Sequence, residues 1–298
     1  MFKRSLSLAL AAATALSLNV TAMAAEYEQF QEQVVEVQTQ AAVEPQAETV
    51  VSYAPVFYVN TQPVEDANMT VIDGEVYVAM RAFFNAVLPG SSVNWCDGSA
   101  VITGTTAAGE SLLVTARPGD QYLVANERYL YVAGGVRNVN GCTMAPISVL
   151  AKIFNAPAYT DSYGNWSVWP SGTLLTHGSA YYDQSSLDLL SRLIYAESGN
   201  QPLSGKIAVG NVIMNRVKSA QFPSTIYDVI YQKNQFSVVR NGTINKTPNE
   251  SSVLAAKLVL DGAEVLDDVL FFNQSGLSCW AARNRSYVTT IGSHDFYA

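Results

Sequence analysis

Glu197 is the residue whose type and position most clearly suggest chemistry in this sequence. It stands near the end of a predicted helix that Gly199 terminates, and it lies in line with the apolar face of that helix. A carboxyl group on an apolar face is poorly hydrated, so its pKa rises and it can hold a proton near neutral pH, as a general acid must. The alternative is that Glu197 turns outward into solvent where the helix frays. The apolar positions of this face are Leu187, Leu190, Leu193 and Ile194.

Mostly helical segments follow Glu197 and must position it. The run Gly205–Lys218 is apolar nearly all round, which predicts a buried central helix. Ser224 is predicted to cap a short helix that continues through Tyr231. Thr247–Glu250 has the pattern of a capping box, with its proline at the first helical position, and it opens a helix that Gly262 closes. Two short strands are expected at Leu270–Phe272 and Val288–Ile291.

The region from Pro55 to Pro170 has a different character. Short alternating apolar runs are separated by Asp-Gly and Asn-Gly pairs, which favour tight turns between strands. Two segments, Asp73–Ile102 and Asn140–Val168, each predict a turn, a strand, a short helix and a strand pair that carries a tryptophan. We interpret this echo as an internal duplication. The chain is therefore expected to be α+β, with a small duplicated α+β accessory domain followed by a mostly α domain.

The N-terminus has the pattern of a secretory signal. Lys3 and Arg4 precede an apolar stretch that is short for a membrane span, and an A-x-A cleavage site ends at Ala24. Residues 1–24 are therefore expected to be a signal peptide. The mature protein is therefore expected to be secreted, with no stable membrane insertion after cleavage.

Charge and composition narrow the range of partners and cofactors. The net charge is −8 and no basic stripe is present, so nucleic acid is not an expected partner. Cys96 and Cys142 could pair, which would leave Cys279 unpaired. The two histidines, His177 and His294, are far apart in the sequence, so no metal or other cofactor is expected. The expected boundaries place a disordered spacer at 25–54, the accessory domain at 55–170, a linker at 171–183 and the second domain at 184–298.

Residues from about Tyr58 to Trp169 resemble the copper amine oxidase N-terminal-like domain found in many secreted bacterial proteins. The likeness rests on the repeated pattern of strand, helix and strand pair. It implies a non-catalytic accessory module, which could hold the protein at a cell wall or act as a plain spacer. Despite the family's name, no histidine cluster stands here to ligate a metal.

The second domain contains six motif blocks in a fixed order. The blocks are Ile194–Glu197, Ala208–Val217, Phe222–Ile226, Tyr231–Ser237, Phe271–Asn273 and Ile291–Tyr297. Together they resemble the SleB-type cell wall hydrolases, the spore cortex-lytic enzyme family. The resemblance implies a lysozyme-like, mostly α domain that acts on peptidoglycan glycan strands. It also implies an extracellular or cell wall associated protein of a bacterium, with the spore as one location. It implies a lytic transglycosylase, which cleaves the β-1,4 bond between N-acetylmuramic acid and N-acetylglucosamine and leaves 1,6-anhydromuramoyl ends.

Glu197 matches the catalytic glutamate of that family. It would protonate the glycosidic oxygen and then accept the proton of the muramic acid 6-hydroxyl, so a second acid is not obligatory, although hydrolysis would normally need one. The candidates for a second acid, which read better as caps and surface charge, are Asp183, Asp228, Glu250 and Asp295. The residues in or near the matched blocks that could bind the glycan are Tyr195, Gln235, Phe236, Ser237, Asn273, Trp280 and His294.

Two positions depart from the family pattern. Asn200 stands where members usually carry a second acid, three residues after the catalytic one, and Gln274 replaces a proline. An amide cannot hold a charge, so the alternative is a non-catalytic wall-binding protein with a degenerate lysozyme-like domain. A cysteine peptidase or amidase that uses Cys279 and His294 is a further alternative.

Overall fold

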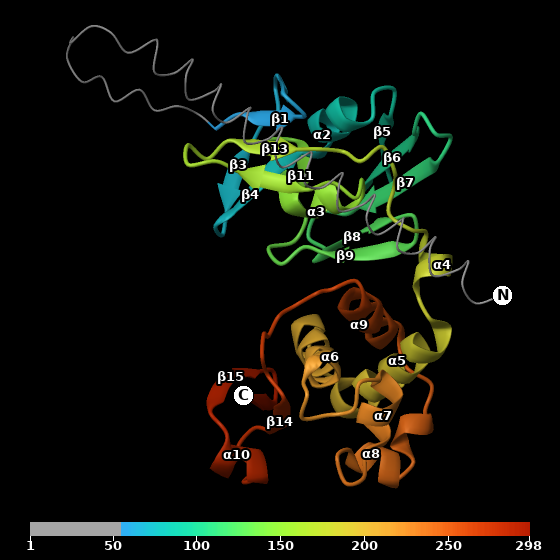
Figure 1. Cartoon of the computed structure of the whole chain (residues 1–298), viewed down its shortest axis with the longest axis vertical. Coiled ribbons are helices and arrows are strands. Elements are labelled where there is room, and N and C mark those ends of the chain that lie inside the picture. The colour runs from blue at the N-terminus through green and yellow to red at the C-terminus, as the bar shows by residue number, and fades with distance from the viewer. Residues whose placement is uncertain (1–54) are drawn as a thin grey trace, which may run out of the picture.

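The computed structural model describes residues 55–298 (Figure 1). The N-terminal part is built of small sheets and the C-terminal part mostly of helices, so the α+β class is confirmed. The expected signal peptide and the spacer at 25–54 lie outside the described residues. Over the described residues, none of the helices has the length and apolar character needed to cross a bilayer.

The described N-terminal part contains thirteen short strands and two helices. Its elements in chain order are β1 (Phe57–Val59), β2 (Gln62–Pro63), β3 (Thr70–Ile72), β4 (Glu75–Ala79), α2 (Met80–Val87), β5 (Ser92–Cys96), β6 (Ser99–Thr105), β7 (Ser111–Ala116), β8 (Tyr122–Ala125), β9 (Arg128–Tyr131), β10 (Arg137–Val139), β11 (Cys142–Pro146), α3 (Ile147–Lys152), β12 (Ala158–Thr160) and β13 (Trp166–Val168). They form sheets of order β12-β13-β1-β2, β10-β11-β4-β3 and β5-β6-β7-β8-β9.

The predicted tight turns are confirmed by their backbone angles. Asp73 and Gly74 join β3 to β4 with φ of 51° and 84°, and Asn140 and Gly141 join β10 to β11 with φ of 52° and 81°. Two positive φ values in a two-residue loop match the twist of the flanking strands, and Asn, Asp and Gly reach this region at low cost.

The duplication is visible in the order of elements. Strand β4, helix α2 and the pair β5–β6 repeat as β11, α3 and the pair β12–β13. Strands β4 and β11 lie side by side and antiparallel at the centre of one sheet, with Val78 opposite Ala145. Phe83 of α2 and Phe154, which follows α3, share one aromatic core, and their rings lie 6.1 Å apart.

The C-terminal part packs around a central helix. Its elements are α5 (Gln184–Ser198), α6 (Leu203–Lys218), α7 (Ile226–Tyr231), α8 (Ser237–Arg240), the 3-10 turn η1 (Thr243–Asn245), α9 (Glu250–Leu260), β14 (Phe271–Gln274), α10 (Trp280–Asn284), β15 (Tyr287–Ile291) and β16 (His294–Tyr297). Helix α6 is buried on nearly every face, as its composition predicts. A Cβ atom at Gly210 would lie 2.7 Å from Val259, so this glycine permits the close approach of α6 and α9.

Several local expectations are wrong in detail. Thr225, not Ser224, caps α7, and Asn249, not Thr247, caps α9, so Pro248 precedes that helix. Thr225 and Asn249 have side-chain oxygens that accept from a backbone N–H as well as those of Ser224 and Thr247 would. The residue that caps each helix is therefore decided by where the backbone turns into the helix. The sequence did not indicate β16, which lies between β14 and β15 in a three-stranded antiparallel sheet. All three cysteines are free, so Cys96 and Cys142 do not pair.

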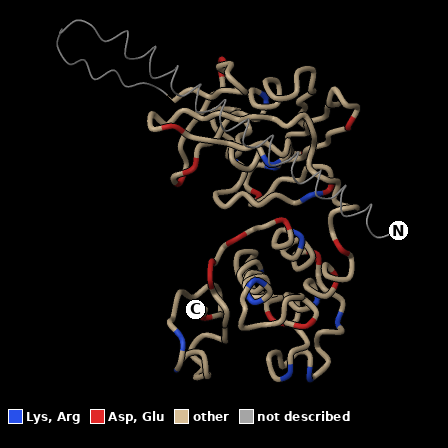
Figure 2. Tube along the Cα trace, viewed as in Figure 1, with Lys and Arg blue, Asp and Glu red and all other residues tan. Residues whose placement is uncertain are grey.

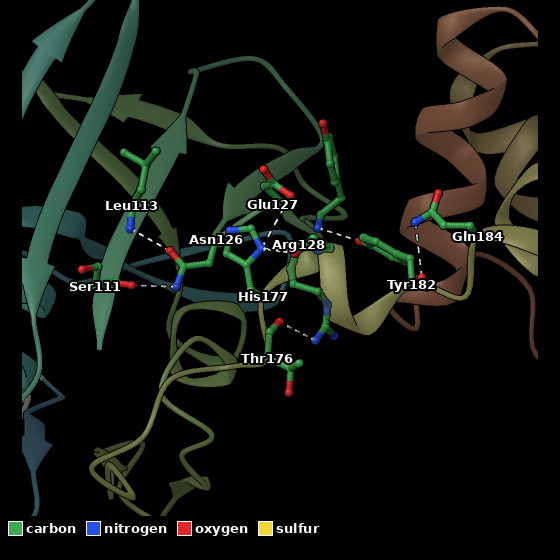
Figure 3. Close-up of polar contacts among 11 residues, drawn as sticks. Ser111, Leu113, Asn126, Glu127, Arg128, Thr176, His177, Tyr182 and Gln184 are labelled. Carbon is green, nitrogen blue, oxygen red and sulfur yellow. Dashed lines mark hydrogen bonds and ion pairs between the residues drawn. The ribbon is translucent and has the colours of Figure 1, made fainter. Parts of the chain in front are cut away.

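The segment 171–183 is packed onto both parts of the chain. Leu174 and Leu175 are buried in the N-terminal core, the short helix α4 (Gly178–Tyr181) follows, and Tyr182 is buried in the C-terminal core. Figure 3 shows the Tyr182 ring reaching from the helical part toward β9, where its hydroxyl accepts from the backbone N–H of Tyr129 at 3.1 Å. The two parts therefore share a defined interface between β9 and α9.

Candidate active site

Glu197 occupies the last turn of α5, and the structure confirms the predicted helix and the partial burial of this side chain. Desolvation raises the pKa of the Glu197 carboxyl to about 7. Within residues 55–298 its carboxyl group makes no hydrogen bond, so nothing stabilises the charged form against this loss of hydration. A carboxyl in this state can carry a proton near neutral pH and release it to a bound acceptor.

Glu197 lines a cleft of about 640 Å³ in the C-terminal part. The cleft lies between the end of α5, helix α6, the loop before α8, and strands β14 and β16. Its other lining residues are Arg216, Tyr231, Gln232, Lys233, Asn234, Gln235, Phe236, Ser237, Val239, Arg240, Phe272, Asn273, Gln274, Leu277 and His294. Glu197 is thus the sole acid among the described residues that line this cleft, which also holds three cationic side chains.

Five of the seven predicted glycan-binding residues come together with Glu197 in the cleft. They are Gln235, Phe236, Ser237, Asn273 and His294. Asn273 donates its side-chain N–H to the carbonyl of Leu277 at 2.9 Å, which fixes the loop after β14. The other two, Tyr195 and Trp280, do not line this cleft. Trp280 is 53 % exposed and its ring packs on Phe271 outside the cleft, at 5.7 Å between centroids.

His294 is buried at the edge of the cleft. Its ring packs against those of Phe272 and Phe296, with centroids 5.4 Å and 6.3 Å away. Desolvation lowers the pKa of His294, and this outweighs the opposite effect of Asp295. The neutral imidazole is therefore favoured at physiological pH, and it can donate or accept one hydrogen bond at each nitrogen.

Arg216 is a cleft residue that sequence reasoning missed. Its side chain is buried, donates from Nε to the carbonyl of Leu270 at 2.8 Å, and has the ring of Phe222 4.8 Å from its Cζ. Burial lowers the pKa of Arg216 to about 10, so it remains charged at neutral pH. An arginine in a helix that is otherwise apolar was the available signal, and it lies inside the block Ala208–Val217.

Three buried polar atoms at this cleft lack a partner in the protein. They are Nη1 of Arg216, Oε1 of Gln232 and Nδ1 of His294, and they are three of seven such atoms in the described part of the chain. Buried polar groups are nearly always hydrogen-bonded, so unpaired ones gathered at one cleft mark a surface suited to a polar ligand.

None of the candidates for a second acid lines the cleft. Asp183 caps α5, and Asp228 accepts a hydrogen bond from the Thr225 hydroxyl at the start of α7. Glu250 opens α9, and Asp295 accepts from Thr290 on the neighbouring strand. The reading of these acids as caps and surface charge fits their positions.

Asn200 is exposed and lies outside the cleft lining. Its side-chain oxygen accepts from Nε2 of Gln201 at 2.9 Å, and Gln201 in turn accepts from the backbone N–H of Ser293 at 2.8 Å. Gln201 thus ties the segment after α5 to the turn before His294, and Asn200 contacts the Gln201 side chain.

The cysteine–histidine hypothesis has no support in the geometry. The sulfur of Cys279 accepts from the backbone N–H of Ala282 and caps α10, whereas His294 faces the cleft. His177 lies in the other half of the molecule and caps α4. Among residues 55–298, no three side chains of His, Cys, Asp or Glu are grouped as a metal site.

Comparisons with known proteins match two separate regions of the chain. Residues 200–297 match the family model described as Cell Wall Hydrolase. The matched range begins three residues after Glu197. Residues 58–166 match the Copper amine oxidase N-terminal domain. Among curated proteins, the spore cortex-lytic enzyme of Bacillus cereus is 34 % identical over 42 % of this chain and 48 % of its own length. That of Oceanobacillus iheyensis is 30 % identical over 45 % and 49 %.

The chain thus spans about half the length of these curated relatives. Two solved structures are also similar. The catalytic domain of the Bacillus cereus SleB protein is 32 % identical, with 39 % of this chain and 92 % of that chain covered and a TM-score of 0.37. The SleB catalytic domain from Bacillus anthracis is 30 % identical, with 42 % and 100 % covered and a TM-score of 0.38. The chain therefore carries a domain of the SleB-type cell wall hydrolase family, preceded by a region that matches the copper amine oxidase N-terminal domain.

Proposed function

We propose that this protein is a secreted peptidoglycan lytic transglycosylase, which cleaves the β-1,4 bond between N-acetylmuramic acid and N-acetylglucosamine. The observation that carries the proposal is Glu197, a single acid in a polar cleft with its pKa raised to about 7 by burial. The relatives named as spore cortex-lytic enzymes support the substrate class.

Glu197 would carry out both proton transfers. In its protonated form it donates to the glycosidic oxygen as the C1–O bond of N-acetylmuramic acid breaks, and the N-acetylglucosamine hydroxyl leaves. The resulting carboxylate takes the proton from the 6-hydroxyl of the muramic acid while O6 bonds to C1. Glu197 is protonated again at the end and no water is consumed. Hydrolysis by the usual two-carboxylate routes would require a partner acid, and the described lining of the cleft offers none.

The rest of the cleft would orient the sugars. Arg216 and Gln232 each present one unpaired buried polar atom, a donor and an acceptor, that could bind N-acetyl and hydroxyl groups. Lys233 and Arg240 are exposed at the same cleft. Figure 2 shows Lys and Arg scattered over both parts rather than gathered in a long basic run, which suits an uncharged glycan backbone better than a nucleic acid.

Mass spectrometry of digests of purified peptidoglycan tests the proposal. The wild type should release fragments with 1,6-anhydromuramoyl ends, Glu197→Gln should release none, and Glu250→Gln should match the wild type because Glu250 is an exposed acid at the start of α9. Fragments with reducing ends would instead make the protein a hydrolase. Binding without any product from the wild type would support a non-catalytic wall-binding protein.

A further inference from the structure

A second groove, of about 780 Å³, lies in the N-terminal part and is unrelated to the cleft around Glu197. It is bordered by α2, β5, the loop between β2 and β3, and the turn between β10 and β11. Figure 1 shows α2 and β5 on the side of this part that faces away from the C-terminal helices. The interface with α9 therefore leaves this groove open.

Trp95 is the outstanding residue of the groove. Its side chain stands on β5 and is 59 % exposed, whereas Trp169 of the same domain is 5 % exposed. Trp95 pairs with Ala100 on β6, and Ala82 and Ala86 of α2 also line the groove. Small side chains beside a large exposed indole leave a flat apolar surface that a ring could cover. The face of an indole that is exposed inside a groove offers a sugar ring an apolar surface on which to stack.

Amide side chains surround this aromatic surface. Asn85, Asn94 and Asn138 line the groove and all three are exposed. The Asn94 side chain donates to Ser92 at 2.9 Å, and that of Asn138 accepts from the backbone N–H of Gly141 at 3.2 Å. The Asn85 side chain makes no hydrogen bond to another described residue. Donors and acceptors beside an apolar platform match hydroxyl and N-acetyl groups on the edge of a sugar ring.

The charges in the groove disfavour a densely anionic polymer. Arg81 is the cation of the groove, and its guanidinium is held by the carbonyl of Val93 at 3.1 Å. Glu65 and Asp66 both lie on the opposite border. With acids in excess and a chain of net charge −8, a glycan strand with at most one carboxylate per disaccharide fits better than a nucleic acid or another chain with a phosphate on every unit.

We propose that this groove is a second glycan-binding site, in which the indole of Trp95 stacks on a sugar ring of the peptidoglycan strand. This inference rests on the proposed function, which identifies the polymer as peptidoglycan. The site gives the protein a second hold on the strand that its cleft cleaves. Two sites on one polymer raise the apparent affinity because the second contact forms within a single complex.

Binding can be measured without cleavage in a Glu197→Gln background of the full chain. The ligands are peptide-free N-acetylated glycan strands and, separately, intact peptidoglycan. Adding Trp95→Ala should weaken binding of both by about tenfold, the loss expected when one aromatic stack is removed. Adding Leu113→Ala, another exposed apolar side chain that lies on β7 and outside the groove, should leave affinity unchanged. In the cleavage-competent chain, Trp95→Ala should still cut short soluble fragments.

Equal affinity of the Trp95→Ala and Leu113→Ala chains for peptide-free strands would overturn the proposal. A loss confined to intact peptidoglycan would also overturn it, because the groove would then bind peptide stems. Circular dichroism of each variant shows that the chain is folded before it is compared. Absence of cleavage by the wild type would contradict the proposed function alone, since these binding measurements do not depend on turnover.

Discussion

The carboxylate of Asp261, which follows α9, forms an ion pair with the guanidinium of Arg128 at the start of β9. The Asp261 side chain is fully buried and that of Arg128 is 12 % exposed. The same carboxylate accepts from the hydroxyl of Tyr182 and from the backbone N–H of Tyr129. One acid therefore fastens the N-terminal domain, the connecting segment and the C-terminal domain together.

Removing this acid should destabilise the whole chain. Asp261→Ala leaves a buried guanidinium and a tyrosine hydroxyl without their acceptor, so the free energy of unfolding should fall by about 3 kcal/mol. Asp188→Ala breaks an exposed pair with Arg192 and should cost under about 0.5 kcal/mol. Urea unfolding measures both. Losses of equal size would mean that the interface pair contributes no more than a surface pair.

Arg216 should be needed for activity beyond its charge. Lysine keeps the charge but loses the planar group that both contacts Leu270 and faces the cleft, so Arg216→Lys should lower kcat/KM by about tenfold. Arg283→Lys, an exposed residue of α10, is the matched control and should behave as wild type. Turnover on soluble peptidoglycan fragments provides the measurement. Unchanged kinetics in Arg216→Lys would remove this residue from the account of the cleft.

The departure at Asn200 should matter little. Its side-chain oxygen accepts from Gln201, and a carboxylate can accept the same bond, so Asn200→Asp should keep the end of α5 in place. We expect kcat/KM to stay within about twofold of wild type. Gln201→Ala should have the larger effect, because it releases the backbone of Ser293 beside His294. A large gain of activity in Asn200→Asp would show that the family acid acts directly in the reaction.

Stability should depend on pH through Glu197. Its folded pKa of about 7 lies above the ordinary 4.5, so the folded state binds more protons than the unfolded state between these values, and stability falls as pH rises through this window. Glu197→Gln lacks this loss. The free energy of unfolding of Glu197→Gln should equal that of the wild type at pH 4 and exceed it at pH 8 by about 3 kcal/mol. Denaturant unfolding of the wild type and Glu197→Gln at both pH values checks this. A wild-type stability that does not fall relative to Glu197→Gln would contradict the burial of an unpaired carboxyl.

The helices that frame the cleft could be predicted from the sequence because their periodicity is long and regular. Helices α5 and α6 are confirmed in type and close to their predicted bounds. Cap residues were displaced by one or two positions, since neighbouring side chains such as Ser224 and Thr225 can make the same hydrogen bond. Strand β16 carries the polar pair His294 and Asp295 and lacks a plain alternating pattern.

Long-range pairings were beyond the sequence. Five of the seven predicted glycan-binding residues share the cleft because the motif blocks converge, but Trp280 packs elsewhere. Burial of Arg216 depends on aromatic rings from three separate segments, and no spacing rule joins them to α6. The partner of Arg128 is 133 positions away. Such contacts arise from tertiary packing, and no local pattern in a single sequence reveals them.

The pKa of the Glu197 carboxyl is the most direct test of this account. It can be read from the side-chain carbon chemical shift in a carbon-13 NMR titration of the full chain, with Glu197→Gln used to assign the signal. The account predicts a value of about 7 and a kcat/KM that declines as pH rises through it, because the general acid is then deprotonated. A value near the ordinary 4.5 would mean that the carboxyl is hydrated and charged at neutral pH, and it would contradict the role proposed for Glu197.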